Sequence, residues 1–201
     1  LHPRVRRQRQ MCIRDRFYGL VCNGIDENGR YIMVDKDGDG EISDPADYDY
    51  IGSAQPKLTY GITNTFRYKN FDLSFFLRGT IGNDILNATR MAYAQSGFLP
   101  GTNALDDPLT YTLSETPRFS NYYLEKGSFM RLDNLTLGYK IKALNGIRVY
   151  FTAQNLFVIT KYKGLDPEVP MDSGDGLTPG VEPREFYPKA RTFSVGLNLN
   201  F

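Results

Sequence analysis

The stretch Leu58–Gly79, LTYGITNTFRYKNFDLSFFLRG, decides the fold class of this chain. Apolar and polar residues alternate along it with a period of two, the spacing at which side chains leave one face of a β-strand. Asn70 interrupts the alternation and marks a tight turn, so the stretch predicts a β-hairpin. Its apolar face would carry Leu58, Tyr60, Ile62, Phe66 and Tyr68, followed after the turn by Phe71, Leu73, Phe75 and Leu77.

The same alternation recurs towards the end of the chain. Short turns at 69–71 and 142–147 alternate along the chain with long loops at about 83–127 and 163–187. The first long loop holds a short helical candidate at 87–96. Transmembrane β-barrels show this asymmetry, with short turns on one side and long loops on the other. We expect strands at about 57–69, 71–83, 128–142, 147–162 and 190–201, with a possible sixth at 29–35.

The polar faces of these strands are rich in Ser, Thr, Asn, Gly and Gln and carry few charges. A soluble barrel places charged residues outside, whereas a membrane barrel turns apolar residues to lipid and small polar residues to a wet lumen. The pattern therefore predicts an all-β, antiparallel transmembrane barrel. Because five or six strands are too few to close one, and an open sheet in lipid leaves backbone groups unpaired, we expect a fragment of a larger barrel, with Phe201 ending the last strand.

Composition excludes several other functions. The net charge of +1 hides a basic segment, residues 1–16, with six arginines; the remainder has 18 basic against 22 acidic residues and no basic stripe, which argues against nucleic-acid binding. This segment is either foreign to the natural protein or a disordered basic arm, and we assign 17–201 to the barrel. With His2 as the only histidine and Cys12 and Cys22 as the only cysteines, the residues for a catalytic triad are missing, so we expect no enzyme.

An acidic loop, Asp35–Gly40 (DKDGDG), is the best candidate for a ligand site. Its D-x-D-x-D-G spacing turns three carboxylates into one bend, as in the first half of an EF-hand calcium loop. The pattern then departs from the EF-hand, because the twelfth position is Ala46 and not Glu. The alternative is a Gly/Asp turn without an ion. The predicted Ca²⁺ ligands are Asp35, Asp37, Asp39, Glu41 through its backbone carbonyl, and Asp47.

Several segments, in the order in which they occur along the chain, resemble the C-terminal part of the SusC/RagA-type TonB-dependent transporters of Bacteroidota outer membranes. The two most specific ones are EKGSFMRLDNLTLGYKI at 125–141 and FTAQNLFVITKYKGLDPEV at 151–169. The others are DKDGDG followed by Ile51-Gly52, Tyr60-Gly61 followed by FDLSFFLRGTIGNDI at 71–85, and the terminal YPKARTFSVGLNLNF at 187–201.

This resemblance implies a 22-stranded barrel, of which the chain would supply the last five or six strands. It further implies location in the outer membrane among its lipids, a SusD-like lipoprotein partner, and TonB coupling through an N-terminal region. It implies import of oligosaccharides or peptides. The alternative from another class is a soluble, calcium-dependent carbohydrate-binding β module.

Other charged residues have weaker functional interpretations. The stretch DYDYIG at 47–52 could stack on sugar or lie at the headgroup boundary, and we favour the latter. Arg131 and Asp133 share a strand face and could pair within the barrel wall. Carboxylates of the last long loop are expected to be solvated, without a catalytic role; they are Asp166, Glu168, Asp172 and Asp175.

Overall fold

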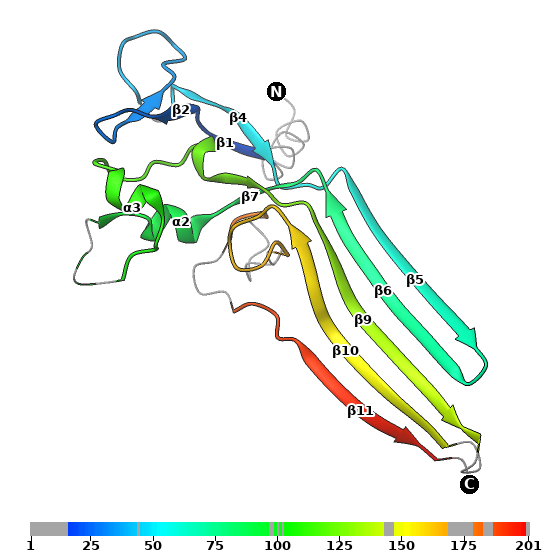
Figure 1. Cartoon of the computed structure of the whole chain (residues 1–201). Helices are drawn as coiled ribbons and strands as arrows, with labels where there is room; N and C mark the ends of the chain where they lie inside the picture. Colours follow the sequence, from blue (N-terminus) through cyan, green and yellow to red (C-terminus); the bar gives the residue numbers. More distant parts are fainter. Residues whose placement is uncertain are drawn as a thin grey trace, which may run out of the picture.

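The computed structural model describes residues 16–43, 45–96, 99, 101, 103–142, 147–168, 179–182 and 187–199. A long antiparallel sheet dominates it, with the strand order β11-β10-β9-β6-β5 (Figure 1). The five predicted strands are confirmed, each within a few residues of its expected bounds. They are β5 (Leu58–Tyr68), β6 (Phe71–Ile81), β9 (Phe129–Ile141), β10 (Ile147–Thr160) and β11 (Thr192–Asn198).

The register of the sheet aligns the apolar residues of all five strands. Phe66 pairs with Leu73, Leu73 with Leu137, Leu137 with Phe151, and Phe151 with Val195. Because successive side chains point to opposite faces, this row and its neighbours two residues away form one surface, here called the apolar face.

The adjacent row of the sheet consists entirely of hydroxyl side chains. Thr65, Ser74, Thr136, Thr152 and Ser194 follow one another across the same five strands. The Oγ1 atoms of Thr136 and Thr152 lie 3.2 Å apart, within hydrogen-bonding distance. We call the surface that carries this row the hydroxyl face.

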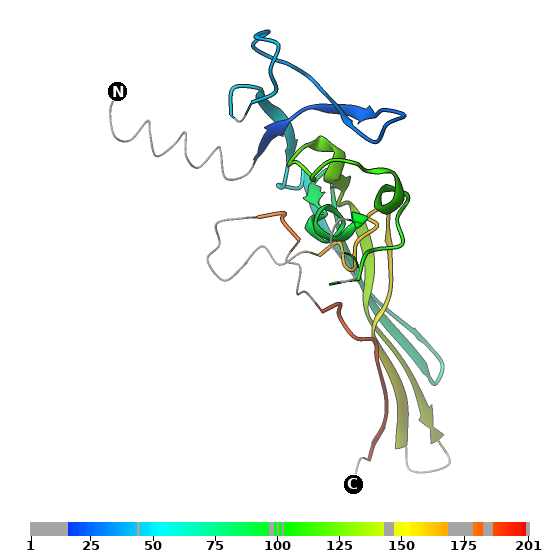
Figure 2. The same ribbon diagram turned by 90° about the vertical axis from the view of Figure 1, so that its left-hand side faces the viewer.

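The connections lie at two ends of the sheet. At one end, Lys69 and Asn70 join β5 to β6, with Lys69 at a φ of 53°, and β9 ends at Ile141 six positions before β10 begins. At the other end, the longer segments form a separate region, here called the head (Figures 1 and 2). The predicted asymmetry between short turns and long loops is confirmed, although the predicted turn residues 143–146 lie outside the described residues.

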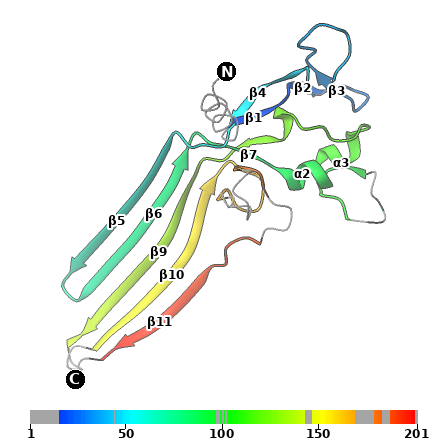
Figure 3. The same cartoon turned by 180° about the vertical axis from the view of Figure 1, so that it is seen from behind.

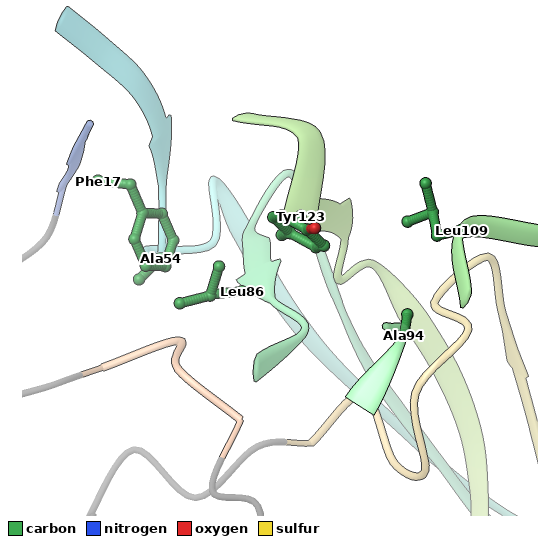
Figure 4. Packing of buried hydrophobic residues seen from close by; sticks show 6 residues of the cluster. All are labelled: Phe17, Ala54, Leu86, Ala94, Leu109 and Tyr123. Carbon is green, nitrogen blue, oxygen red and sulfur yellow. The ribbon is translucent and has the colours of Figure 1, made fainter. Parts of the chain in front are cut away.

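The head consists of short elements around a small core. Its strand pairs are β1 (Arg16–Leu20) with β4 (Tyr48–Ser53), β2 (Cys22–Ile25) with β3 (Tyr31–Met33), and β7 (Asp84–Leu86) with β8 (Leu124–Lys126). The helices are α2 (Ala88–Tyr93), α3 (Pro108–Thr112) and the 3₁₀ turn η2 (Asn121–Tyr123). The core contains Phe17, Ala54, Leu86, Ala94, Leu109 and Tyr123 (Figure 4).

Two expectations about the head need correction. The stretch 29–35 does not add a sixth strand to the long sheet, because Tyr31–Met33 pairs with β2 instead. The loop at 83–127 is more structured than expected: the helical candidate at 87–96 is confirmed by α2, but β7, α3 and β8 were not predicted. Arg16, placed with the basic segment, begins β1, while residues 1–15 and Phe201 lie outside the described residues. Among the described residues, none of the helices has both the length and the apolar character needed to cross a membrane.

Candidate functional site

The two faces of the sheet differ in what they present to their surroundings. On the apolar face, Phe66, Leu137 and Val195 are 53%, 45% and 76% exposed. An apolar surface of this extent is rare on a soluble monomer and marks a membrane or an interface. Near the short turns, the ring centroids of Phe71 and Tyr139 lie 4.5 Å apart. Aromatic residues near the strand ends are typical of the girdles of membrane barrels.

An ion pair lies on the hydroxyl face near the short turns. Arg148 on β10 donates from Nε to Asp72 Oδ1 on β6 at 2.9 Å, and a second bond joins its guanidinium to Oδ2 at 2.5 Å. The pair passes over Gly138 on the intervening strand, where a Cβ atom would lie 2.5 Å from both side chains. Glycine is therefore needed here for close approach.

A larger cluster of charges lies on the hydroxyl face where the sheet meets the head. Arg78 of β6 and Arg131 of β9 are neighbours across the strands. Arg131 is only 1% exposed and donates to Asp166 Oδ1 at 2.5 Å, and Asp166 itself is 4% exposed. Arg78 donates to both oxygens of Glu168, at 2.5 and 2.9 Å. We call these residues, with Asp133, Asn155 and Lys189, the arginine cluster.

A β-bulge brings the last of these side chains into the cluster. The register between β9 and β10 shifts between Gln154 and Phe157, and Asn155 adopts a φ of 53°. The Asn155 amide accepts a hydrogen bond from Arg131 and donates to the carbonyl of Lys189 at 2.7 Å. The bulge thus connects the strands to the segment that precedes β11, in keeping with the role of bulges in redirecting side chains.

The arginine cluster corrects two interpretations of the sequence. Asp166 and Glu168 are not solvated carboxylates of a free loop, because both pair with arginines of the barrel wall. Asp133 pairs with Arg78 at 3.2 Å, whereas Arg131 pairs with the loop, so these two residues have different partners. Asp172 and Asp175 lie outside the described residues.

The surroundings of Glu168 favour its ionised form. Burial raises the pKa of this carboxyl, but hydrogen bonds from Arg78 and Lys189 and the charges of both outweigh that effect, so the pKa lies below its ordinary value. Lys189 Nζ lies 2.5 Å from Glu168 Oε2. Glu168 therefore joins two parts of the last long loop to β6.

The structure brings together three of the predicted calcium ligands. Oxygen atoms of Asp35, Asp37 and Asp39 all lie within 4.8 Å of one another. The loop is shaped by its own carboxylates: Asp35 accepts from the backbone N–H groups of Gly38 at 2.6 Å and Gly40 at 2.9 Å. The N–H of Asp39 lowers the pKa of Asp37, but burial and the neighbouring carboxylates outweigh it and raise that pKa overall.

The other two predicted ligands have different surroundings. Asp47 is buried, and its two oxygens accept from the backbone N–H groups of Lys36 at 2.7 Å and Ser43 at 2.8 Å, which closes the base of the loop. The N–H groups of Ser43 and Lys36 hold the pKa of Asp47 below its usual range. Glu41 is exposed, and its N–H donates to Asp39 at 2.8 Å. Calcium binding stays a prediction. Among the predicted ligands, the carboxylates of Asp35, Asp37 and Asp39 are the ones that lie close together.

The tyrosine-rich stretch 47–52 overlaps β4 at the edge of the head. Asp49 pairs with Lys36 at 3.0 Å, and the Arg16 guanidinium lies over the Tyr50 ring at 5.3 Å. Whether the stretch contacts sugar or lipid headgroups stays a prediction.

Sequence reasoning missed the joint role of Arg78, Asn155 and Lys189. The available signal was the presence of arginines on polar strand faces that otherwise carry few charges. Their partners could not be inferred, since Arg78 and Glu168 are separated by 90 positions.

Comparison with known proteins gives a consistent result. No family model matches the chain. It is 38% identical over 195 residues to the TonB-dependent receptor SusC of Bacteroides thetaiotaomicron, covering 88% of this chain and 18% of that protein. It is 35% identical over 225 residues to the TonB-dependent receptor P3 of Formosa agariphila, covering 92% of this chain and 22% of that protein.

The fold is similar to that of a solved transporter. The structure of the RagAB peptide importer in a closed-closed state matches with a TM-score of 0.69 and 26% identity, over 90% of this chain and 22% of that one. The chain thus spans about a fifth of the length of the relatives it matches. With its sequence identity, its antiparallel sheet and this structural match, the chain belongs to the SusC/RagA-type TonB-dependent receptors.

Proposed function

We propose that the chain forms part of the barrel wall and the outer loops of a TonB-dependent transporter in the bacterial outer membrane. The observation that carries this proposal is the two-faced sheet, in which an apolar row and a hydroxyl row each run unbroken across five strands. An apolar face suits lipid, and a face of small hydroxyl groups suits a wet lumen. The kinship with SusC and P3 supports the same reading.

The edges of the sheet indicate how the wall is completed. Among the described strands, β5 and β11 each pair on one side only (Figure 3). In the hydrocarbon region, each unpaired backbone group would cost several kcal/mol. We therefore expect further strands of the same receptor to pair with both edges and close the barrel.

The position of the head suggests the orientation of the transporter. Membrane barrels carry their longer connections on the extracellular side. The head would then lie outside the cell, where a SusD-like lipoprotein could cover it, while contact with TonB would involve residues beyond this chain. The two-component name of the RagAB importer supports such a partner.

The proposed activity is active import of oligosaccharides or peptides, with no catalytic role for the residues described. The RagAB importer is named for peptides. The hydroxyl row and the Arg148–Asp72 pair would line part of the permeation path and offer hydrogen bonds to a polar solute. A soluble calcium-dependent module is not favoured, because the matched relatives are receptors and importers.

A transport assay on the complete receptor tests this proposal. The gene containing this chain is deleted in its host, and uptake of fluorescent oligosaccharides and peptides is measured with and without a protonophore. We expect uptake of at least one substrate class to be lost on deletion, restored by the intact gene and abolished by the protonophore. Normal uptake of all substrates by the deletion strain, or recovery of the protein in the soluble fraction, would contradict the proposal.

A further inference from the structure

A cavity of about 440 Å³ opens on the apolar face where the sheet meets the head. From the sheet it is lined by Tyr60, Ile81 and Ile159, and from the head end by Lys126 and Lys161. Tyr60, Gly79, Met130 and Ile159 form one row across the strands, which places the cavity on the apolar face and not beside the arginine cluster. It therefore lies on the opposite face of the sheet from the arginine cluster and the Arg148–Asp72 pair.

The head side of the cavity carries an excess of positive charge. Lys126 Nζ lies 2.8 Å from Asp84 Oδ1, but its side chain remains 76% exposed. Lys161 has no carboxylate within ion-pair distance in the part of the chain that the structure describes. Two lysines thus line this side of the cavity, and a single aspartate pairs with one of them.

The sheet side of the cavity is apolar and open. Ile159 is 58% exposed and Ile81 49% exposed, and both continue into the apolar face. A molecule that fits both sides has an anionic group beside the lysines and a hydrocarbon chain along the strands. Lysine ammonium groups attract anionic headgroups at a membrane surface while their stems cover apolar area.

We propose that this cavity binds the phosphorylated headgroup of a membrane lipid, whose acyl chain lies on Ile81 and Ile159. The inference rests on the proposed function, since it requires the apolar face to contact lipid. It adds to that function a specific lipid site at the outer boundary of the bilayer. Lys161 supplies the uncompensated charge, and Lys126 adds a second donor that Asp84 orients.

Native mass spectrometry of the complete receptor in detergent tests the site. The probes are phosphorylated lipid A, lipid A without its phosphates, and inorganic phosphate. The variant is K126Q/K161Q, and the control K69Q/K140Q removes two lysines near the opposite end of the sheet. Because K126Q also breaks the pair with Asp84, the single variant K161Q is measured beside it, since Lys161 forms no ion pair with any described residue.

We expect wild type and control to retain phosphorylated lipid A and K126Q/K161Q to bind it about tenfold or more weakly, with K161Q between them. Dephosphorylated lipid A should bind wild type as weakly as the variant, and inorganic phosphate should not compete. Equal binding of both lipids, equal loss in the control, or competition by inorganic phosphate would overturn the inference. Heat-modifiable migration on a gel reports separately whether the receptor forms a barrel. If the barrel forms and the variants bind lipid as wild type does, only the lipid site is refuted. If wild type shows no heat-modifiable migration, the proposed function is refuted as well.

Discussion

Replacing Arg131 by Met should release the last long loop from the barrel wall. Arg131 and Asp166 are 1% and 4% exposed and lie 2.5 Å apart, so the substitution leaves a buried carboxylate without its cation. Removing one partner of a buried ion pair costs about 3–5 kcal/mol. Asp166 retains the N–H of Glu168 at 2.9 Å, a single backbone bond that cannot replace the guanidinium.

Hydrogen exchange measures this effect directly. If the cost appears as opening of the loop, amide protection across residues 161–168 should fall at least about a hundredfold, since about 1.4 kcal/mol corresponds to a factor of ten. The complete receptor is compared in lipid nanodiscs as wild type, R131M and R131M/D166N. The double variant removes the orphaned charge and should recover most of the protection.

Arg148→Met provides a matched control. Arg148 also pairs with a carboxylate on the hydroxyl face, but its partner is Asp72 and its side chain is 31% exposed. R148M should therefore leave the exchange of residues 161–168 unchanged. Unchanged protection in R131M, or an equal loss in R148M, would refute the view that the arginine cluster holds the loop.

Three further predictions concern single features. The folded pKa of Glu168 lies below its ordinary value of 4.5, so its ionised form stabilises the docked loop at all higher pH. This contribution is lost as the pH falls through the lowered pKa. Hydrogen exchange of residues 161–168 should therefore accelerate only below about pH 4.5 in wild type, and this step should be missing in E168Q. Gly138→Ala should lower the free energy of unfolding in lipid vesicles by about 1–3 kcal/mol, because the added Cβ would overlap the Arg148–Asp72 pair. In the control G61A the added Cβ meets only the Phe76 ring, at 3.3 Å, so the free energy of unfolding should fall by less. Calcium titration should slow exchange in 35–40, with binding at least about tenfold weaker in D37N; identical exchange with and without calcium would leave the loop as a Gly/Asp turn.

The long strands could be predicted because their signal is repeated and local. In β6, Phe71, Leu73, Phe75 and Leu77 recur at every second position, with Asp72, Ser74 and Arg78 on the opposite face, and each of the other long strands carries a similar pattern. Alternation also grouped the side chains of each face correctly, since Phe66, Leu73 and Leu137, which were predicted to lie on apolar strand faces, pair in one row of the sheet. The loop asymmetry followed from the spacing of these strands alone.

The head and the arginine cluster could not be predicted, for two physical reasons. Strands such as β3 and β8 have three residues each, too few to show a period, and they form because a partner strand is available. The cluster depends on contacts between distant segments, with Arg131 and Asp166 separated by 35 positions. The bulge at Asn155 shifts the register between β9 and β10, and an alternating pattern gives no sign of it.

Whether the sheet is the wall of a membrane barrel is tested most directly by comparing the two faces of β9 at one depth in the membrane. Leu137 lies in the apolar row and Thr136 in the hydroxyl row, next to each other in the sequence. Nitroxide labels at L137C and T136C, in a C12S/C22S background of the complete receptor, are examined in lipid bilayers by their collisions with oxygen and with a water-soluble nickel chelate. If the apolar face contacts lipid, oxygen, which concentrates in lipid, should dominate at 137, and the chelate should dominate at 136. Equal access of the chelate to both labels would contradict the claim that this sheet is the wall of a membrane barrel.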